Sequence, residues 1–245
     1  MKNIITNSNK QVVNNRVADE AIYQTLDYYD NPKEYFCSTL NEIERELGEP
    51  TSLLDVGCSN GAFLYHTQKR FCSTELKGID PIQSLVNLAR ENLNNVNIFN
   101  LNILDEALVE VTGVSMAVTM MGVMYLFRDP ERVIRNLLGL VSKGGAVFIF
   151  SSFNEEPVDV LVNYRRAPKG EWVQAHNLFS MKTIESYCSE MSASCRWVDF
   201  SMSKPIPKTG DPMRSWTEPF RGNPHHIFYG TNMFSTMKLL VIRKS

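Results

Sequence analysis

The sequence predicts an α/β fold in which a mostly parallel sheet is flanked by helices. Apolar runs bounded by turn residues alternate with segments of helical periodicity through most of the 245 residues, and this alternation is typical of parallel sheets built from strand, helix and strand units. The run AVFIF at 146–150 is rich in β-branched and aromatic residues and fits a buried strand. We therefore expect one domain with one large core.

The apolar runs and turn signals place the core elements in order. We expect strands at 53–56, 75–79, 96–99, 114–120 and 146–150, and helices at 62–71, 81–92 and 130–141. Pro81 and Pro130 suit the first turn of a helix, where the missing N–H has no partner to lose. We expect the helix at 130–141 to end at the turn formed by Lys143, Gly144 and Gly145.

Two helices are expected before this core. Residues 21–29 and 32–47 have helical character, and they are separated at Asn31 because the proline that follows disfavours helical backbone there. The first residues, 1–15, are polar and Asn-rich with no apolar centre, so we expect an arm and no secretory signal.

The part after the core is expected to complete the sheet. Ser180 is suited to cap a helix that runs to residue 191, and strands are expected at 194–201 and 236–243. The insertion 203–234 is rich in Pro and Gly, and we expect an irregular binding loop or lid. The single domain, 1–245, then divides into the arm and capping helices (1–49), a core (50–152) and a second half with the lid (153–245).

Composition excludes several classes of protein. Lys and Arg number 25 against 27 Asp and Glu, for a net charge of −2, and no basic stripe is present for a nucleic acid backbone. No stretch approaches the roughly 18 uncharged apolar residues of a membrane span. Five cysteines form no CxxC pair, which fits reduced thiols in a cytoplasmic protein.

The stretch LLDVGCSNGAFL at 53–64 has the pattern of a ligand-binding loop. A buried strand runs into a turn bracketed by Gly57 and Gly61, and a helix follows at once. Free N–H groups and the helix dipole at such a turn favour an acceptor-rich ligand, although both glycines are also compatible with a tight turn alone. Asp55, just before the turn, adds a carboxylate to this end of the strand.

Polar residues follow the next two strands as well. Asp80 lies in GIDP and Asn102 comes after the third strand, so the carboxyl ends of neighbouring parallel strands would bring them beside the loop. A carboxylate at the position of Asp80 is able to accept from both hydroxyls of a ribose. The alternative is that Asp80 only caps the helix that begins at Pro81.

These segments together resemble the class I S-adenosylmethionine-dependent methyltransferases. The resemblance rests on LLDVGCSNG, GIDP, NLNILDE and TMMGVMYLFRDPERVIRNLLGLVSKGGAVFI and covers about residues 50–152. It implies a Rossmann-like, seven-stranded, mostly parallel sheet with S-adenosyl-L-methionine bound at its edge. The implied cofactor-binding residues are Tyr29, Asp55, Gly57, Cys58, Ser59, Gly61, Asp80, Pro81, Asn102, Ile103, Met120 and Met121.

The resemblance assigns these residues to three parts of the cofactor. The loop from Asp55 to Gly61 would surround the methionine part, Asp80 would bind the ribose, and Asn102 with Ile103 would lie beside the adenine. Met120 and Met121 would line the site near the sulfonium. Tyr28 and Tyr29, in the helix before the core, could close over the methionine end or serve only as core residues. The family often has Asp in place of Asn102 and a third glycine in place of Ser59.

Other functions compete with this interpretation. In a nicotinamide-dependent oxidoreductase, GCSNGA would be an incomplete GxGxxG motif. Asp55 would also place a carboxylate beside two phosphates, which is an unfavourable contact between like charges. A scaffold that binds cofactor without turnover would keep the same residues. A methyltransferase acting on nitrogen, carbon or a protein would share the whole cofactor half.

A weak nucleophile such as a sugar hydroxyl benefits from a general base, and few residues qualify. His176, His225 and His226 lie in the second half of the chain, and Tyr125 follows the fourth strand. No acidic residue or cysteine stands at ligand spacing around the histidine pair, so we expect no metal.

The second half also resembles small-molecule methyltransferases of bacterial surface-polysaccharide and sugar biosynthesis, through a pattern of Pro, Arg, Trp and Phe in IPKTGDPMRSWTEPFRGNPHHIFYGTNMFSTMKLLVIRK. This resemblance implies a small polar acceptor, either a sugar or a nucleotide-linked metabolite. If the acceptor carries phosphate, Arg165, Arg166, Arg214 and Arg221 are available to bind it.

Overall fold

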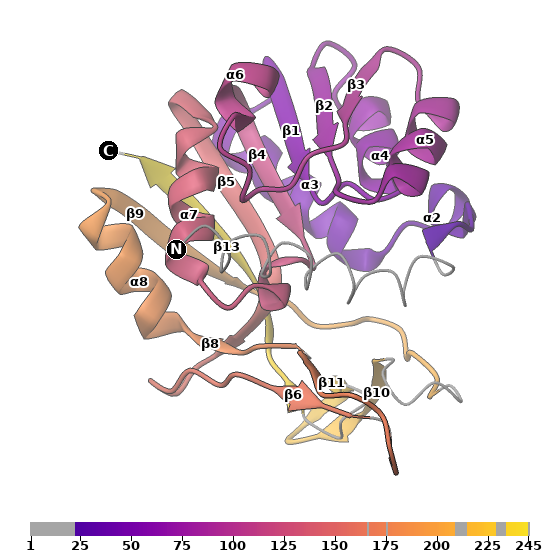
Figure 1. Ribbon diagram of the computed structural model, residues 1–245, viewed down its shortest axis with the longest axis vertical. Helices are drawn as coiled ribbons and strands as arrows, with labels where there is room; N and C mark the ends of the chain where they lie inside the picture. Colours follow the sequence, from indigo (N-terminus) through magenta and orange to yellow (C-terminus); the bar gives the residue numbers. More distant parts are fainter. Residues whose placement is uncertain (1–22, 166, 175, 209–214, 229–233, 245) are drawn as a thin grey trace.

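The computed structural model describes residues 23–165, 167–174, 176–208, 215–228 and 234–244. Its centre is a sheet with the strand order β3-β2-β1-β4-β5-β13-β9 (Figure 1). Neighbouring strands are parallel except for β13, which is antiparallel to both β5 and β9. The strands are β1 (Ser52–Val56), β2 (Glu75–Ile79), β3 (Val96–Phe99), β4 (Ser115–Met121), β5 (Val141–Asn154), β9 (Ala193–Asp199) and β13 (Met237–Lys244). The predicted seven-stranded, mostly parallel α/β sheet is confirmed.

Two apolar layers cover this sheet because side chains alternate along each strand. Leu54 and Ile149 face a core that also contains side chains of α6, α7 and α8, whereas Leu53 and Phe148 face a core with side chains of α3, α4 and α5. The helices are α3 (Glu34–Leu47), α4 (Ala62–Arg70), α5 (Gln83–Asn92), α6 (Leu108–Thr112), α7 (Pro130–Gly139) and α8 (Met181–Glu190).

Most predicted boundaries agree with the structure to within a few residues. Asn31 has non-helical backbone between α2 (Asp27–Asp30) and α3, as the proline after it predicts. Ser180 caps α8, and its hydroxyl accepts from the N–H of Thr183 at 3.0 Å. α5 begins two residues later than predicted, at Gln83. Of the predicted helix at 21–29, the part before residue 23 lies outside the described residues, and the rest is helical mainly at α2.

The turn predicted at Lys143, Gly144 and Gly145 is wrong. α7 ends at Gly139, and these three residues lie inside β5, where the register with β4 shifts. A Cβ on Gly145 would come within 2.3 Å of the Met116 carbonyl oxygen. Glycine is therefore needed for close approach of two strands and not for a helix end.

The insertion between β9 and β13 is also more regular than predicted. Its described residues include a three-stranded antiparallel sheet of β10 (Trp216–Phe220), β11 (Asn223–Phe228) and β12 (Phe234–Ser235). Further short elements were not predicted either, namely α6, the 3-10 helix η1 (Met124–Leu126), β6 (Asn163–Tyr164), β7 (Val173–Gln174) and β8 (Phe179–Ser180).

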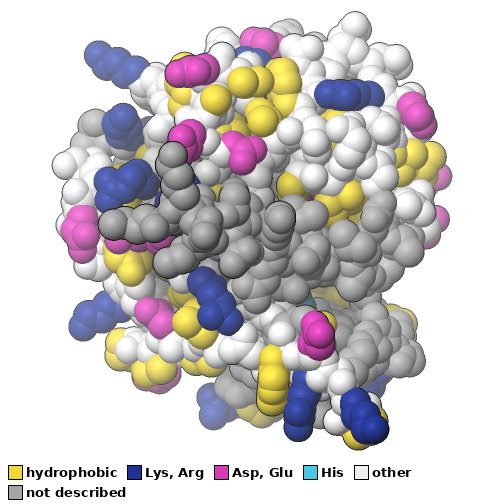
Figure 2. Space-filling model, in the orientation of Figure 1, with side chains coloured by type: hydrophobic (Ala, Val, Ile, Leu, Met, Phe, Trp, Pro, Cys, Tyr) yellow, Lys and Arg dark blue, Asp and Glu magenta, His cyan; other side chains and the backbone are white. Residues whose placement is uncertain are grey.

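The small sheet lies below the carboxyl ends of the parallel strands in Figure 1, so the two enclose the edge at which α/β sheets bind ligands. On the face shown in Figure 2, basic and acidic side chains are interspersed without a continuous basic stripe. No helix within the described residues is long and apolar enough to cross a membrane.

Candidate functional site

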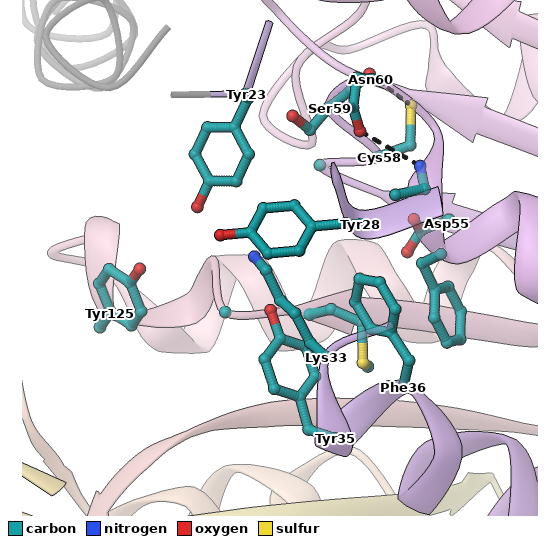
Figure 3. Close-up of a pocket in the computed structure, with 15 residues that line it drawn as sticks. Tyr23, Tyr28, Lys33, Tyr35, Phe36, Asp55, Cys58, Ser59, Asn60 and Tyr125 are labelled. Atoms are coloured by element: carbon teal, nitrogen blue, oxygen red, sulfur yellow. Dashed lines mark hydrogen bonds between the residues drawn. The ribbon is translucent and has the colours of Figure 1, made fainter. Parts of the chain in front are cut away.

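A cavity opens where the loops after β1 and β4 meet the start of α3 (Figure 3). Its volume is about 540 Å³, and we call it the loop cavity. Figure 3 shows Asp55 at one end, Tyr125 at the other, and Tyr28, Lys33 and Tyr35 between them. The lining includes the predicted residues Asp55, Gly57, Cys58, Ser59, Met121 and Tyr125.

The loop after β1 owes its shape to residues with left-handed backbone. Gly57, Ser59 and Gly61 have φ of 78°, 53° and 86°, a region that glycine enters without steric cost. The N–H groups of Gly57 and Cys58 donate to the carbonyl of Ile79, at 2.8 and 3.0 Å, which fixes the loop to the end of β2. The pattern LLDVGCSNG is thus a loop held against two strands.

Gly61 is needed for a second reason. A Cβ at this position would lie 2.5 Å from Cδ1 of Leu93 and 3.2 Å from the hydroxyl of Tyr29. The contact with Leu93 is closer than real Cβ atoms show, so a larger residue would force that side chain to shift, in addition to the strain of a positive φ.

Asp55 brings a carboxylate to the base of the loop cavity. It is 2% exposed, and its Oδ1 accepts from the hydroxyl of Thr119 on β4 at 2.7 Å. A buried carboxylate is costly unless hydrogen bonds or a positive partner compensate it. Asp55 thus places a hydrogen-bonded carboxylate among the residues that line the loop cavity.

Asp80 lies behind the loop and is fully buried. Its Oδ2 accepts from the N–H of Ser59 at 2.9 Å, and its Oδ1 accepts from the N–H of Ile82 at 2.9 Å. The helix cap expected as an alternative is not observed, because the N-cap of α5 is Ile82 and has no side-chain cap; the bond from Ile82 instead closes the turn before the helix. Contact between Asp80 and a ribose stays a prediction.

A narrow second cavity lies on the other side of Gly57, and we call it the apolar slot. The space between its walls is about 290 Å³ when the open solvent at its mouth is included. The side chains around it are mostly apolar, with one amide, and are Val56, Ile79, Pro81, Leu101, Asn102, Ile103, Val123 and Phe127. Asn102 is held by its own loop, since its Oδ1 accepts from the N–H of Leu104 at 3.0 Å. Pro81, Asn102 and Ile103 thus come together as predicted from the sequence.

Lys33 and Tyr28 both line the loop cavity; Lys33 was not predicted from the sequence, and Tyr28 was considered there only as a residue that could cover the methionine end. The Lys33 ammonium lies 4.3 Å from the ring centroid of Tyr28, 5.0 Å from Tyr23, 5.6 Å from Tyr35 and 5.9 Å from Phe36. Ring faces attract a cation at these distances. Lys33 is the basic residue and Asp55 the acidic residue among those that line this cavity.

Tyr29 supports the loop from behind and is not among the residues that line the cavity. Its hydroxyl donates to the carbonyl of Asn60 at 2.6 Å, and its ring packs on Tyr65 with centroids 4.6 Å apart. Burial, followed by the nearby Cys58 and Tyr65, raises the pKa of this hydroxyl far above its usual value. Tyr29 therefore stays a hydrogen-bond donor to the loop.

The two methionines at the end of β4 face opposite sides of the sheet. Met121 lines the loop cavity and accepts from the hydroxyl of Thr39 at its sulfur, 3.4 Å away. Met120 is fully buried in the core that also holds side chains of α7 and α8. The structure thus brings only Met121 to the cavity.

The four predicted catalytic residues fall into two groups. The ring of His176 meets the ring of Tyr125 edge-on, with centroids 4.3 Å apart, and Tyr125 lines the loop cavity. The segment that carries His176 is docked there by the N–H of Asn177, which donates to the Tyr125 carbonyl at 2.9 Å. His225 and His226 line a different cavity. Within the described residues, no group of three or more His, Cys, Asp or Glu side chains is arranged to hold a metal.

Residues 28–193 match the family model described as "Methyltransferase domain". The fold is similar to the crystal structure of the plantazolicin methyltransferase BpumL in complex with a triazolic desmethylPZN analog and SAH, with a TM-score of 0.58, 12% sequence identity and coverage of 100% of both chains. It is also similar to Streptomyces venezuelae DesVI, with a TM-score of 0.57 and 16% identity over 92% of this chain and 98% of that one. A third similar structure is the DhpI-SAH complex, with a TM-score of 0.57 and 14% identity over 97% of each chain. No protein of curated function matches the chain.

Proposed function

The chain belongs to the methyltransferase-domain family and is an S-adenosylmethionine-dependent methyltransferase, and we propose that it methylates a hydroxyl of a small polar acceptor. The acceptor class we propose is a sugar or nucleotide-linked metabolite of surface glycan synthesis. The observation that supports the proposal is the edge-on contact of His176 with Tyr125, which lines the loop cavity, because the imidazole could serve there as a proton acceptor.

The two cavities beside Gly57 fit the two halves of the cofactor. The loop cavity holds one carboxylate, Asp55, and one ammonium, Lys33, and this charge pair complements a zwitterionic amino acid. We infer that Asp55 holds the α-ammonium group and Lys33 the α-carboxylate of the methionine part.

The apolar slot suits a flat aromatic base. Ile103 and Phe127 supply apolar surface, and Asn102 supplies an amide. Because Oδ1 of Asn102 already accepts from the loop backbone, a contact to adenine would come from its Nδ2. Asp80 lines neither cavity and is fully buried, so a bond to the ribose would require the loop above it to move.

When bound, the cofactor supplies a methyl group on a positively charged sulfur, and no metal or redox partner is needed for its transfer. The remaining task of the protein is to align the acceptor, exclude water and take up a proton. Tyr28, Tyr35 and Phe36 line the loop cavity with ring surface, which would help to exclude water once the ligands are bound. The imidazole of His176 is the group that would take the proton of the acceptor hydroxyl.

Support for a phosphate group on the acceptor is weaker. The Arg165 guanidinium lies 5.1 Å from the ring of Trp172 and that of Arg221 lies 5.2 Å from the ring of Phe220. Both are thus packed on aromatic rings of their own surroundings. Arg166 and Arg214 lie outside the described residues.

The proposal is tested by incubating the purified protein with S-adenosylmethionine carrying an isotopically labelled methyl group and a panel of acceptors. The panel contains neutral sugars, amino sugars, nucleotide sugars, simple amines and a peptide. Label on the oxygen of a sugar supports the proposal. Label only on an amine, a carbon atom or the peptide would overturn it.

A further inference from the structure

A third cavity lies between the carboxyl edge of the main sheet and the small sheet of the insertion. Its volume is about 650 Å³, and we call it the distal cavity. Its walls come from the ends of β5 and β9, the start of β13 and strand β11. The residues that matter for its chemistry are Glu155, Asp199, Phe200, His225, His226 and Lys238.

The distal cavity is separated from the loop cavity by a row of three aromatic rings. Phe200, in the distal cavity, meets Phe150 edge-on at 4.9 Å between centroids, and Phe150 stacks on Tyr35 at 4.3 Å with an angle of 12°. Tyr35 in turn lines the loop cavity. Phe150 is only 2% exposed, so a molecule that reached from one cavity to the other would contact the partly exposed rings of Tyr35 and Phe200, which Phe150 supports from beneath.

The chain after β9 also joins the two cavities. Ser201 and Met202 line the distal cavity, and the next two N–H groups, of Ser203 and Lys204, donate to the carboxylate of Glu34 at 2.7 and 3.1 Å. Glu34 stands between the loop-cavity residues Lys33 and Tyr35. The same short segment thus runs from one cavity to the rim of the other.

The charged groups of the distal cavity are ordered by depth. The Lys238 ammonium, 7% exposed, lies 2.7 Å from Oδ1 of Asp199 and 2.8 Å from Oε1 of Glu155, whose side chains are 91% and 61% exposed. Burial disfavours the charged form of Lys238, but the two carboxylates outweigh it and raise its pKa. One ammonium at the base and two carboxylates at the opening leave one net negative charge.

His226 adds polar atoms without positive charge near neutral pH. Burial, and then the charge of Arg221, lowers the pKa of His226, so its imidazole is neutral and can either donate or accept. His225 lines the cavity beside it on β11. A carboxylate pair beside the neutral imidazole of His226 is well suited to hydroxyl and ammonium groups and repels phosphate.

We propose that the distal cavity binds a part of the acceptor remote from the methylated atom, and that it takes a hydroxyl-rich ring, preferably one bearing an amine, in preference to a sugar phosphate. This inference rests on the proposed sugar acceptor and specifies its chemistry. It implies an elongated acceptor, whose reacting hydroxyl lies beside Tyr125 while a second ring occupies the distal cavity.

The side-chain NMR signals of the histidines test this proposal directly, because the chain has only four of them. His225→Gln and His226→Gln assign the two signals of the distal cavity. The full chain is titrated with glucosamine, glucose and glucose 1-phosphate, each at the same concentrations. We expect each probe to give saturable shifts of both signals. The affinity should be highest for glucosamine, lower for glucose and lowest for glucose 1-phosphate.

The charge of the opening is tested with a variant that leaves the buried lysine in place. Asp199→Asn, at an exposed carboxylate, should weaken glucosamine binding about tenfold, the effect of losing one charged hydrogen bond. Glu110→Gln, which removes the same charge from the exposed surface of α6, should leave it unchanged. Equal or tighter binding of glucose 1-phosphate, or no saturable shift with any probe, would overturn the proposal.

The methylation assay separates this inference from the proposed function. If a sugar is methylated but no probe shifts the two histidine signals, the distal cavity is not a recognition site. If the shifts occur but only a non-sugar acceptor is methylated, the binding site stands and the sugar acceptor is wrong. SAH provides an internal control, since it should shift the signal of His176 beside Tyr125.

Discussion

Asp80 and Ser59 are joined by a hydrogen bond of 2.9 Å from the Ser59 N–H to Oδ2 of the carboxylate. The second oxygen of Asp80 accepts from the N–H of Ile82 at the same distance. One buried side chain therefore fixes both the loop after β1 and the turn before α5. A substitution that removes the Asp80 carboxylate should therefore change the shape of the site as well as any contact with a ligand.

Asp80→Asn should reduce both stability and cofactor binding. An amide has only one oxygen, so one of the two buried N–H groups loses its partner at a cost of about 1 to 3 kcal/mol in the free energy of unfolding. Affinity for SAH should fall tenfold or more. Urea unfolding and calorimetric titration measure the two effects, with Asp30→Asn on α2 as an exposed control. Unchanged affinity in the folded variant would mean that Asp80 serves only the fold.

Lys33→Met should weaken binding of ligands that carry the methionine carboxylate. One charged hydrogen bond contributes about 1.5 to 3 kcal/mol, which is at least about tenfold in the dissociation constant. The loss should be larger for SAH than for S-adenosylmethionine, because the lysine also repels the positive sulfonium of the latter. Binding of 5′-methylthioadenosine, which lacks the amino acid, should not change.

The matched control for this prediction is Lys69→Met. The Lys69 ammonium also lies over a tyrosine ring, 4.0 Å from the centroid of Tyr65, but it does not line the loop cavity. Equal losses for SAH and 5′-methylthioadenosine with Lys33→Met would show that the lysine only shapes the cavity and does not bind the carboxylate.

Gly61→Ala should destabilise the protein by about 2 to 4 kcal/mol. The new methyl group is strained at φ 86° and clashes with Leu93, and each effect costs on the order of 1 to 3 kcal/mol. Gly139→Ala, at the end of α7, meets no atom within 4 Å and should stabilise the protein slightly. Thermal and urea unfolding of the two variants measure the difference. Equal stability would contradict the packing described for the loop.

The core of the fold is predictable because its signals are local. Each parallel strand is a short apolar run followed by a turn residue and a periodic helix, so the strands of residues 53–150 appear at nearly the observed places. The small sheet of the insertion was missed because Pro219 and Pro224 lie within β10 and β11 and argue against strands. The pairing of its strands depends on contacts between residues that lie too far apart to appear in one short stretch of sequence.

Some residues of the site were also predictable from local sequence signals, and others were not. The residues of the glycine loop follow from the motif, because backbone conformation at Gly57 and Gly61 requires that residue type. Lys33 and Tyr28 carry no comparable pattern, and their place in the loop cavity depends on how the segment before the sheet folds back. The contact between Tyr125 and His176 joins residues about fifty positions apart, so only the tertiary structure brings them together.

His176→Gln should slow methyl transfer while leaving cofactor binding intact. Removal of a general base lowers the rate by about 10² to 10⁴, and the glutamine side chain keeps a polar group beside Tyr125. His225→Gln serves as the comparison: because His225 lines the distal cavity, its loss should raise the KM for the acceptor and leave kcat near that of the unmodified protein. Steady-state kinetics with the acceptor found by the labelling assay, together with titration of SAH, separates these effects. An unchanged kcat in the His176 variant would show that the acceptor loses its proton without help from this residue, as an amine nucleophile does, and would shift the proposal from oxygen to nitrogen.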